Sequence, residues 1–340
     1  MTAREYPVFT VTPKAERSLR AGHPWVYGEE VTAVEGAYQN GDMVDVVSNK
    51  GRYLGTGWVN DHSKIRVRII SRNANDTFDE AFFRRRVRYA LNYRKTVMGP
   101  VDYRCCRLIF GEADQFPGLT VDRFENILVT QVLSLGMERR KDWVYRALVE
   151  LLREDGEQID AIYERNDVTI RTLEGLEQGK GFYQMEGLKT DLSGHVTITE
   201  NRIKYDVDYM EGQKTGFFLD QKYNRQAAAK LARGRRVLDC FTHTGAFALN
   251  AAAAGAEHVT AVDVSAFALE LAAENGKRNG LTNLDYKCAD VFDLLTEMAK
   301  EKKCDYDYII LDPPAFTKSR ATAKTPITAI RRSIGRRCGC

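Results

Sequence analysis

Hydrophobic and polar positions alternate in the first part of the chain, from Val8 to Ser71. Stretches such as GDMVDVVSNKGRYLGTGWVN and KIRVRIIS alternate apolar with polar residues around glycine turns, which predicts short β-strands. Before them, KAERSLRAG predicts a short basic helix that ends near Gly22. We therefore expect a small β-barrel over residues 1–74.

The spacing of apolar residues changes to a helical period in NANDTFDEAFFRRRVRYALNYRKTVM, where Phe82, Val87 and Leu91 recur among basic residues. Farther on, MERRKDWVYRALVELLRE predicts an amphipathic helix. The segment GEADQFPGLTVDRFENILVTQVLS is broken at its Pro-Gly pair and resumes as strands, and DAIYERND and VTIRTLEG predict further strands. Residues 75–198 are therefore expected to form a compact α+β domain.

From residue 199 onward, predicted strands alternate with Ala-rich helices. The strands are RRVLDCFT, HVTAVDVS, NLDYKCAD and YDYIILDPP, and the helices between them are GAFALNAAAAGA, AFALELAAENGKRNG and VFDLLTEMAKE. Three strand–helix units that lead into a fourth strand are typical of a doubly wound parallel sheet of the α/β class. Ligands of such sheets bind beyond the carboxyl ends of the strands.

Length and composition favour an ordinary globular protein of two or three domains, because 340 residues exceed what one core usually organises. No apolar stretch is long enough to span a membrane, and MTAREYPVFT lacks the apolar region of a signal peptide, so we expect a cytoplasmic protein with no membrane partner. The cysteines lack C-x-x-C spacing and zinc-spaced histidines, which predicts neither a metal site nor a disulfide framework. They stand at positions 105, 106, 240, 288, 304, 338 and 340.

Positive charge gathers toward the N-terminus. Residues 1–110 hold 18 Lys+Arg against 12 Asp+Glu, although the net charge of the whole chain is only +3. A polyanion could dock on such a surface, and a solvated charged surface explains it equally well. Candidate phosphate contacts on the predicted basic helix, whose face is often merely solvated, are Arg84, Arg85, Arg86 and Arg88.

Acidic residues mark the carboxyl ends of the four predicted strands of the last domain, at Asp239, Asp263, Asp290 and Asp312. Gly245 closes a turn after the first strand, where backbone amides can approach a ligand closely. Asp263 is placed to accept hydrogen bonds from ribose hydroxyls, and Asp290 from an adenine amino group. The turn lacks the G-x-G-x-x-G fingerprint, which disfavours a nicotinamide cofactor. One such aspartate is commonly a helix cap, but four in succession predict a nucleoside pocket.

Taken together, KTGFFLDQKYNR, VLDCFTHTGAFAL, AVDVS, CAD and DPPAF resemble the class I S-adenosylmethionine-dependent ribosomal RNA large-subunit methyltransferases that make 5-methylcytosine. RSLRAGHPWVY resembles the opening of their N-terminal PUA domain, and GEADQFPGLTVDRF resembles their central domain. The first of these segments, residues 214–225, is the most specific, whereas DPPAF alone would be weak. The resemblance implies a Rossmann-like domain over residues 199–320 behind a PUA-like RNA-binding barrel. It also implies S-adenosylmethionine as cofactor and large-subunit ribosomal RNA as partner.

The resemblance also assigns residues to the parts of the cofactor. It gives the ribose to Asp263, the adenine to Asp290, and the methionine end to Asp239 with Thr242 and Gly245.

Further residues are expected around the cleft. The resemblance places Phe218 and Gln221 along the cofactor, although Phe218 suits a core position as well. Asp312 and the Pro313 carbonyl are placed to hold the edge of the target base, and Phe316 to pack on its face.

Methylation at cytosine C5 needs a cysteine thiolate that adds to C6, and later a base that removes the C5 proton. In the resembled family this cysteine lies in a T-x-S-C-S-like strand after the DPP motif, and no such segment occurs here. We therefore expect an inactive chain. Two other interpretations stay open. One is an exocyclic-amine methyltransferase, which uses a [D/N]-P-P-aromatic motif that Ala315 interrupts here. The other is a non-catalytic RNA-binding protein.

The tail ATAKTPITAIRRSIGRRCGC departs from the expected pattern, since a sheet of this class should continue. A shifted codon reading of Thr328–Cys340 allows Gly-Tyr-Lys-Glu-Ile-Asp-Trp-Ala-Ala-Met-Arg-Leu, which matches the G-Y-K-E-I run of the family. We therefore expect a frameshift near Arg320, with residues 321–340 as an aberrant tail of a truncated domain; a natural variant end is the alternative. The oligomeric state stays open, with a homodimer as one option.

Overall fold

The computed structural model describes residues 6–301 and 305–313. It forms two compact units. Unit 1 comprises the residues up to Val196 together with Val207–Phe217, and unit 2 comprises the remainder. None of the helices in the described residues combines the length and apolar character of a membrane-spanning segment.

The first sheet of unit 1 carries the short strands predicted from the alternating pattern. Its elements are β1 (Val8–Val11), α1 (Pro13–Arg20), β2 (Trp25–Tyr27), η1 (Gly28–Glu30), β3 (Val31–Glu35), β4 (Met43–Ser48), β5 (Tyr53–Val59) and β6 (Ile65–Ser71). The strand order is β2-β6-β5-β4-β1-β3. Helix α1 begins at Thr12, whose hydroxyl accepts a hydrogen bond from the Ala15 amide at 3.3 Å. It buries Ala15 and Leu19 in the core of this sheet.

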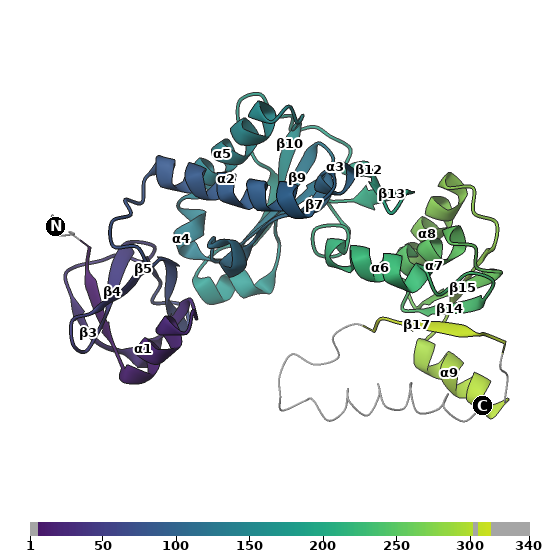
Figure 1. Ribbon diagram of the computed structural model, residues 1–340, viewed down its shortest axis with the longest axis horizontal. Helices are drawn as coiled ribbons and strands as arrows, with labels where there is room; N and C mark the ends of the chain where they lie inside the picture. The colour runs from purple at the N-terminus through teal and green to yellow at the C-terminus, as the bar shows by residue number, and fades with distance from the viewer. Residues whose placement is uncertain (1–5, 302–304, 314–340) are drawn as a thin grey trace. The chain divides into compact units, whose positions relative to one another are not determined.

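A second sheet and two long helices complete unit 1. The elements are α2 (Glu80–Val97), α3 (Pro100–Tyr103), β7 (Cys105–Phe110), η2 (Gly111–Asp114), β8 (Leu119–Phe124), β9 (Ile127–Val132), α4 (Leu135–Glu138), α5 (Lys141–Glu154), β10 (Ala161–Asn166) and β11 (Gly179–Phe182). The strand order is β11-β10-β9-β8-β7. Helices α2 and α5 pack together, as Figure 1 shows, and their apolar faces bury Phe82, Leu91 and Leu148 in one core.

The strand predicted from VTIRTLEG is wrong. Thr169–Glu174 form a 3₁₀ helix, η3, which ends at the left-handed Gly175. The reason is tertiary: the side chain of Arg171 is buried and donates hydrogen bonds to the carbonyl oxygens of Val132 and Glu177. Burying this guanidinium with its partners outweighs the strand propensity of the segment.

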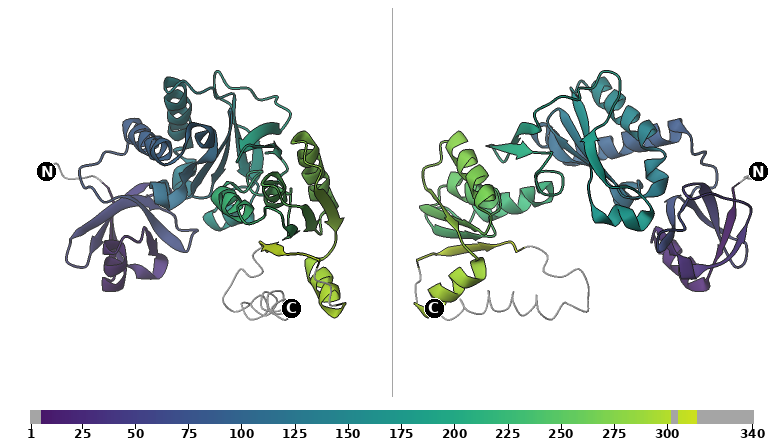
Figure 2. Two further views of the ribbon diagram at one scale, coloured as in Figure 1. Left: turned by 45° about the vertical axis from the view of Figure 1, so that its right-hand side comes forward. Right: turned by 180° about the vertical axis from the view of Figure 1, so that it is seen from behind.

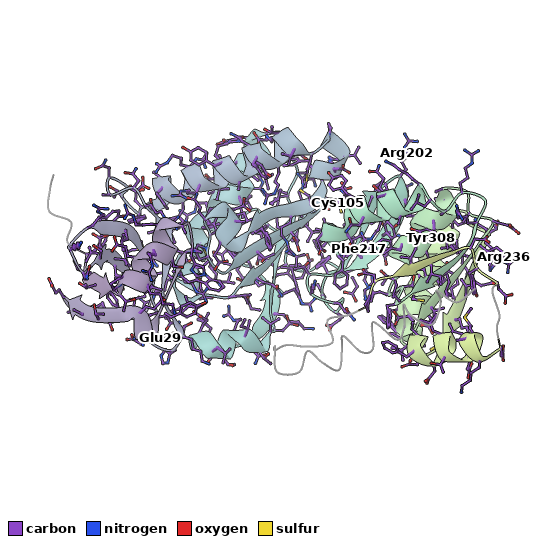
Figure 3. All side chains as sticks on the ribbon, turned by 60° about the horizontal axis from the view of Figure 1, so that its bottom comes forward. Glu29, Cys105, Arg202, Phe217, Arg236 and Tyr308 are labelled. Carbon is purple, nitrogen blue, oxygen red and sulfur yellow. The ribbon has the colours of Figure 1, made fainter. Side chains whose placement is uncertain are left out.

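The hairpin β12 (His195–Glu200) and β13 (Ile203–Asp208) contributes residues to both units. Its turn consists of Asn201 and Arg202, which have φ values of 53° and 68°. Two consecutive left-handed residues are the geometry of a tight two-residue hairpin turn. Arg202 is labelled in Figure 3.

Unit 2 contains the alternating strands and helices expected after residue 199. They are η4 (Leu219–Gln221), α6 (Lys222–Ala229), β14 (Arg236–Cys240), α7 (Ala246–Ala253), β15 (His258–Asp263), α8 (Ala266–Arg278), β16 (Leu284–Cys288), α9 (Val291–Lys300) and β17 (Tyr308–Leu311). Among the described residues the strand order is β16-β15-β14-β17, and all neighbours are parallel. The order reverses between β14 and β17, which is the switch point where ligands of such sheets bind.

Helices cover both faces of this sheet. Successive strand residues point to opposite sides, so one strand can pack against helices on both faces. Val237 packs with α7, whereas Leu238 and Cys240 pack with α9. Helix α8 contacts α7, β15 and β16, so α7 and α8 lie on one face and α9 on the other (Figure 1). Figure 2 shows the same layers from two further sides. Arg236 and Tyr308, labelled in Figure 3, mark the amino ends of β14 and β17.

Candidate active site

The carboxyl edge of the unit 2 sheet brings together the four aspartates singled out from the sequence. Asp239 lies one residue before the end of β14, and Asp263 is the last residue of β15. Asp290 follows β16 by two residues, and Asp312 directly follows β17. Because the strand order is β16-β15-β14-β17, these side chains belong to neighbouring strand ends on one rim.

The turn between β14 and α7 holds an unusual backbone. Phe241, His243 and Gly245 have φ values of 61°, 52° and 79°. A non-glycine residue in this left-handed region costs about 1–3 kcal/mol, and such residues cluster at ligand sites. A Cβ at position 245 would lie 2.6 Å from Leu249 Cδ1 and 2.8 Å from Ala272 Cβ. Only glycine therefore fits at this position, where the turn follows the end of β14.

Asp239 is a buried carboxyl group with one unsatisfied oxygen. Its side chain is 1% exposed, and Oδ2 accepts a hydrogen bond from the Thr242 hydroxyl at 2.5 Å. Oδ1 has no partner of normal hydrogen-bond geometry in the part of the chain that the structure describes. Burial raises the pKa of Asp239 to about 7, the Thr242 hydroxyl and the Ala248 amide lower it, and the charge of Asp312 raises it further. An unpaired oxygen this deeply buried calls for a donor from a ligand.

Asp263 is held by backbone amides on both of its oxygens. Oδ2 accepts from the His243 amide at 2.8 Å, and Oδ1 accepts from the Ser265 amide at 2.9 Å. These bonds fix the orientation of the half-buried carboxylate and leave each oxygen a further lone pair. Two neighbouring hydroxyl donors would suit this arrangement.

Asp290 has a structural task of its own. It is the N-cap of α9, where Oδ1 accepts from the amides of Phe292 at 2.7 Å and Asp293 at 3.2 Å. An N-cap aspartate stabilises a helix by about 1 kcal/mol without any ligand. The predicted contact with an adenine stays a prediction.

Asp312 and Pro313 stand at the last described positions beside the switch point. Cys240 of β14 is in register with Leu311 of β17, so Asp312 lies next to the end of β14 and is exposed. The predicted base contact of Phe316 and the predicted aberrant tail, residues 321–340, lie outside the described residues.

The structure brings Phe218, but not the side chain of Gln221, against the turn. The Phe218 ring meets the His243 ring edge-on at a centroid distance of 5.6 Å. The Phe218 carbonyl accepts a hydrogen bond from Arg225 at 2.6 Å, and Arg225 forms a fully buried ion pair with Glu200 at 2.6 Å. Gln221 Oε1 instead accepts from Asn224 of the following helix, α6, at 2.8 Å.

Sequence reasoning overlooked His243. Its amide orients Asp263, its ring packs on Phe218, and burial lowers the pKa of its imidazole. A lowered pKa favours the neutral ring, in which one nitrogen donates a hydrogen bond and the other accepts one. The segment FTHTG carries no signal that separates this histidine from an ordinary turn residue.

Comparison with known proteins gives a family match for the N-terminal part of the chain and another for the C-terminal part. Residues 9–72 match the PUA-like domain family, and residues 182–338 match the S-adenosylmethionine-dependent methyltransferase family. The ribosomal RNA large subunit methyltransferase I of Alteromonas mediterranea is 39% identical over 312 residues, which are 91% of this chain and 76% of that protein. The enzyme of the same name from Photobacterium profundum is 41% identical over 309 residues, 90% of this chain and 75% of that protein. The chain belongs to the ribosomal RNA large subunit methyltransferase I family.

Membership of this methyltransferase I family agrees with the fold. A solved structure from Streptococcus mutans, described as a SAM-dependent methyltransferase, superposes with a TM-score of 0.77 at 23% identity and covers 96% of this chain and 82% of its own. The predicted α/β class, the PUA-like N-terminal domain and the Rossmann-like methyltransferase domain are confirmed. The predicted domain boundaries and site residues stay predictions.

S-adenosylmethionine, the cofactor of this family, suits the residues on the sheet edge. Its methionine end carries an ammonium group, and the unpaired Asp239 Oδ1 is a buried acceptor for such a donor. Its ribose carries two hydroxyls, and Asp263 retains acceptor capacity on both oxygens.

Proposed function

We propose that this protein is of the type that transfers a methyl group from S-adenosylmethionine to C5 of a cytosine in large-subunit ribosomal RNA, and that the 340-residue chain retains the binding of cofactor and RNA but not the transfer. The substrate named for the relatives and the resemblance of residues 214–225 to cytosine-C5 enzymes support this proposal. The observation that carries the cofactor part is the buried Asp239 carboxyl group, whose Oδ1 lacks a partner among the described residues and which lies beside a turn with left-handed residues.

Different residues of the sheet edge would bind different parts of the cofactor. Asp239, with Thr242 and the turn at Gly245, would hold the methionine end; Asp263 would hold the ribose and Asp290 the adenine. When bound, the cofactor supplies an electrophilic methyl group on a sulfonium. Phe218 and His243 form an apolar wall beside the turn, which would keep water from that methyl group. We also propose that Gln221 lines the cofactor cleft. It stands at the start of α6, where its side chain accepts a hydrogen bond from Asn224.

The target base is proposed to meet Asp312 and the Pro313 carbonyl, which follow β17 beside the cofactor turn. An exposed carboxylate and a carbonyl oxygen are both acceptors, as the exocyclic amine of cytosine requires. The position next to Asp239 would hold the base close to the methionine end of the cofactor.

The nucleophile for this reaction is not found among the described cysteines of unit 2. Cytosine C5 becomes reactive only after a thiolate adds to C6. Cys240 is fully buried against α9, and the Cys288 thiol points to the Val264 carbonyl at 3.5 Å. Since no T-x-S-C-S-like segment follows the DPP motif, we propose that the 340-residue chain binds the cofactor and RNA without turnover.

Calorimetry and a methylation assay test both parts. The chain is titrated with S-adenosylmethionine and then incubated with unmodified large-subunit ribosomal RNA and methyl-labelled cofactor, with nucleosides identified by mass spectrometry. We expect cofactor binding and no labelled nucleoside. Labelled 5-methylcytosine would overturn the inactivity and support the C5 assignment, whereas a labelled exocyclic amine would replace that assignment. Failure to bind the cofactor would overturn the proposed function.

A further inference from the structure

A pocket of about 560 Å³ opens in unit 1, where α2 faces the residues after β6 and the turn after β7. Arg72, Arg85 and Arg86 line it together with Tyr89 and Gln115. None of these residues belongs to the sheet edge of unit 2, and the proposed methyl transfer uses none of them.

The lining of this pocket carries a surplus of positive charge. Asp76 lies 3.4 Å from Arg85 and 3.9 Å from Arg86. The other acid of the lining, Asp114, is already neutralised by Arg94, whose two terminal nitrogens donate to its two oxygens at 3.2 and 2.6 Å. The lining therefore holds three arginines but only one carboxylate, that of Asp76, that Arg94 does not already neutralise. A lining of this kind favours an anion, and guanidinium groups suit phosphate in particular.

Exposed aromatic rings adjoin the pocket. Tyr89 and Tyr93 are 59% and 58% exposed and lie one turn apart on the same face of α2. Phe110, at the end of β7, is 55% exposed. Asp114 links the rings, because it accepts from the Phe110 amide at 2.6 Å and from Arg94, whose guanidinium lies 5.0 Å from the Tyr93 ring. We call Tyr89, Tyr93 and Phe110 the aromatic strip.

Two other arginines of α2, Arg84 and Arg88, have their partners away from this surface. Arg84 donates to Glu150 and Glu154, each at 2.5 Å, and Arg88 donates to Asp155 at 2.8 Å. Acids at and just after α5 therefore already neutralise these two guanidinium groups. Of the four arginines suggested from the sequence as phosphate contacts, only Arg85 and Arg86 line the pocket.

We propose that the pocket and the aromatic strip bind single-stranded RNA. The phosphates would lie against Arg72 and Arg85, and unpaired bases would stack on the aromatic strip. Arginines interleaved with exposed rings are the arrangement that holds splayed nucleotides, whereas the bases of a duplex are not free to stack on side chains. The inference rests on the proposed RNA substrate and adds to it the place where the strand is held.

Fluorescence anisotropy of the full chain with a fluorescein-labelled RNA of about twelve mixed-sequence nucleotides tests this proposal. Tyr89→Ala should raise the dissociation constant about tenfold, because one base no longer has a ring to stack on. Tyr89→Phe should leave it within about twofold, since the ring remains. The double variant Arg72→Gln/Arg85→Gln should weaken binding and reduce the slope of log affinity against log salt by about 0.7 for each phosphate that is no longer neutralised.

Arg104→Gln is the matched control, because its side chain is 55% exposed, against 46% for Arg85, and it does not line the pocket. The single variant Arg85→Gln is measured beside this control. If Arg104→Gln weakens binding as much as Arg85→Gln, the RNA contact is general charge attraction and the pocket proposal fails. Wild-type binding that Tyr89→Ala and the double variant leave unchanged also defeats it, while the proposed function survives. If the wild-type chain binds cofactor but no RNA, both the pocket and the RNA substrate fall. Circular dichroism confirms that each variant is folded.

Discussion

The carboxyl edge of the unit 2 sheet and the α2 pocket of unit 1 are built in opposite ways. The sheet edge relies on a buried carboxyl group, a strained turn and a glycine with no room for a side chain. The α2 pocket relies on exposed arginines and rings that stand out from a regular helix. Substitutions at the sheet edge should therefore lower both the stability of the fold and the affinity for the cofactor. Each substitution in the α2 pocket should weaken the affinity for RNA by a moderate amount and leave the stability of the fold nearly unchanged.

The largest expected effect concerns the buried ion pair behind the cofactor turn. Arg225→Met leaves Glu200, which is fully buried, without its cation, so the free energy of unfolding should fall by about 3–5 kcal/mol. Urea unfolding followed by circular dichroism measures the loss. The double variant Arg225→Met/Glu200→Leu should recover most of it, because no uncompensated charge remains. If Arg225→Met is as stable as the wild type, the sheet-edge region is no more sensitive to substitution than the pocket, and the contrast between the two regions is wrong.

The next effect is steric. Gly245→Ala places a Cβ against Leu249 and Ala272 at a φ of 79°, so it should lower the unfolding free energy by about 1–3 kcal/mol and weaken cofactor binding more than about tenfold. Gly234→Ala is the control, because Gly234 also has a positive φ, 67°, but nothing within 4 Å of its Cβ position among the described residues. Equal losses in the two variants would show that backbone strain alone, and not the close packing of the turn, explains the glycine.

The buried Asp239 should give a dependence on pH. Its pKa is about 7 in the folded protein and near 3.8 in the unfolded chain. Between these values the folded state binds the extra proton, so stability should fall as pH rises, by up to about 1.4 kcal/mol per pH unit. Asp239→Asn should remove this dependence and make the protein more stable at alkaline pH. Urea unfolding across this pH range measures both effects.

Cofactor binding should show the reverse trend at the same residue. An ammonium group prefers the ionised carboxylate, so affinity should rise as pH rises through about 7, and binding below that pH should release a proton. Asp239→Asn should weaken binding about tenfold or more. Calorimetry in buffers of different ionisation enthalpy measures both quantities; pH-independent affinity in the wild type would argue against an ammonium at Asp239.

The smallest effect separates two tasks of Asp290. Asp290→Ala should lower stability by about 1 kcal/mol through loss of the α9 cap. Asp290→Ser keeps a capping oxygen without the charge, so its stability should stay close to that of the wild type. If Asp290→Ser still binds the cofactor normally, the residue is only a cap and the adenine assignment is wrong.

Much of the unit 2 architecture could be predicted from the sequence, because parallel strands and their helices follow from local hydrophobic period and length. The position of Asp263 at a strand end followed from the same pattern. The segment VTIRTLEG failed because the burial of Arg171 depends on carbonyl groups of Val132 and Glu177, to which local propensity is blind. His243 was overlooked for a similar reason, since its role arises from Phe218, which lies far away in the sequence.

Residue types at short spacing were enough to predict the succession of elements, the acidic residues at the strand ends and the family to which they belong. The folded chain was needed to see that Asp239 is buried with an unsatisfied oxygen, that Asp290 caps α9, and that Arg84 faces α5 while Arg85 faces the pocket. Burial, pairing and side-chain direction depend on which distant segments meet. That meeting is settled by packing of the whole chain.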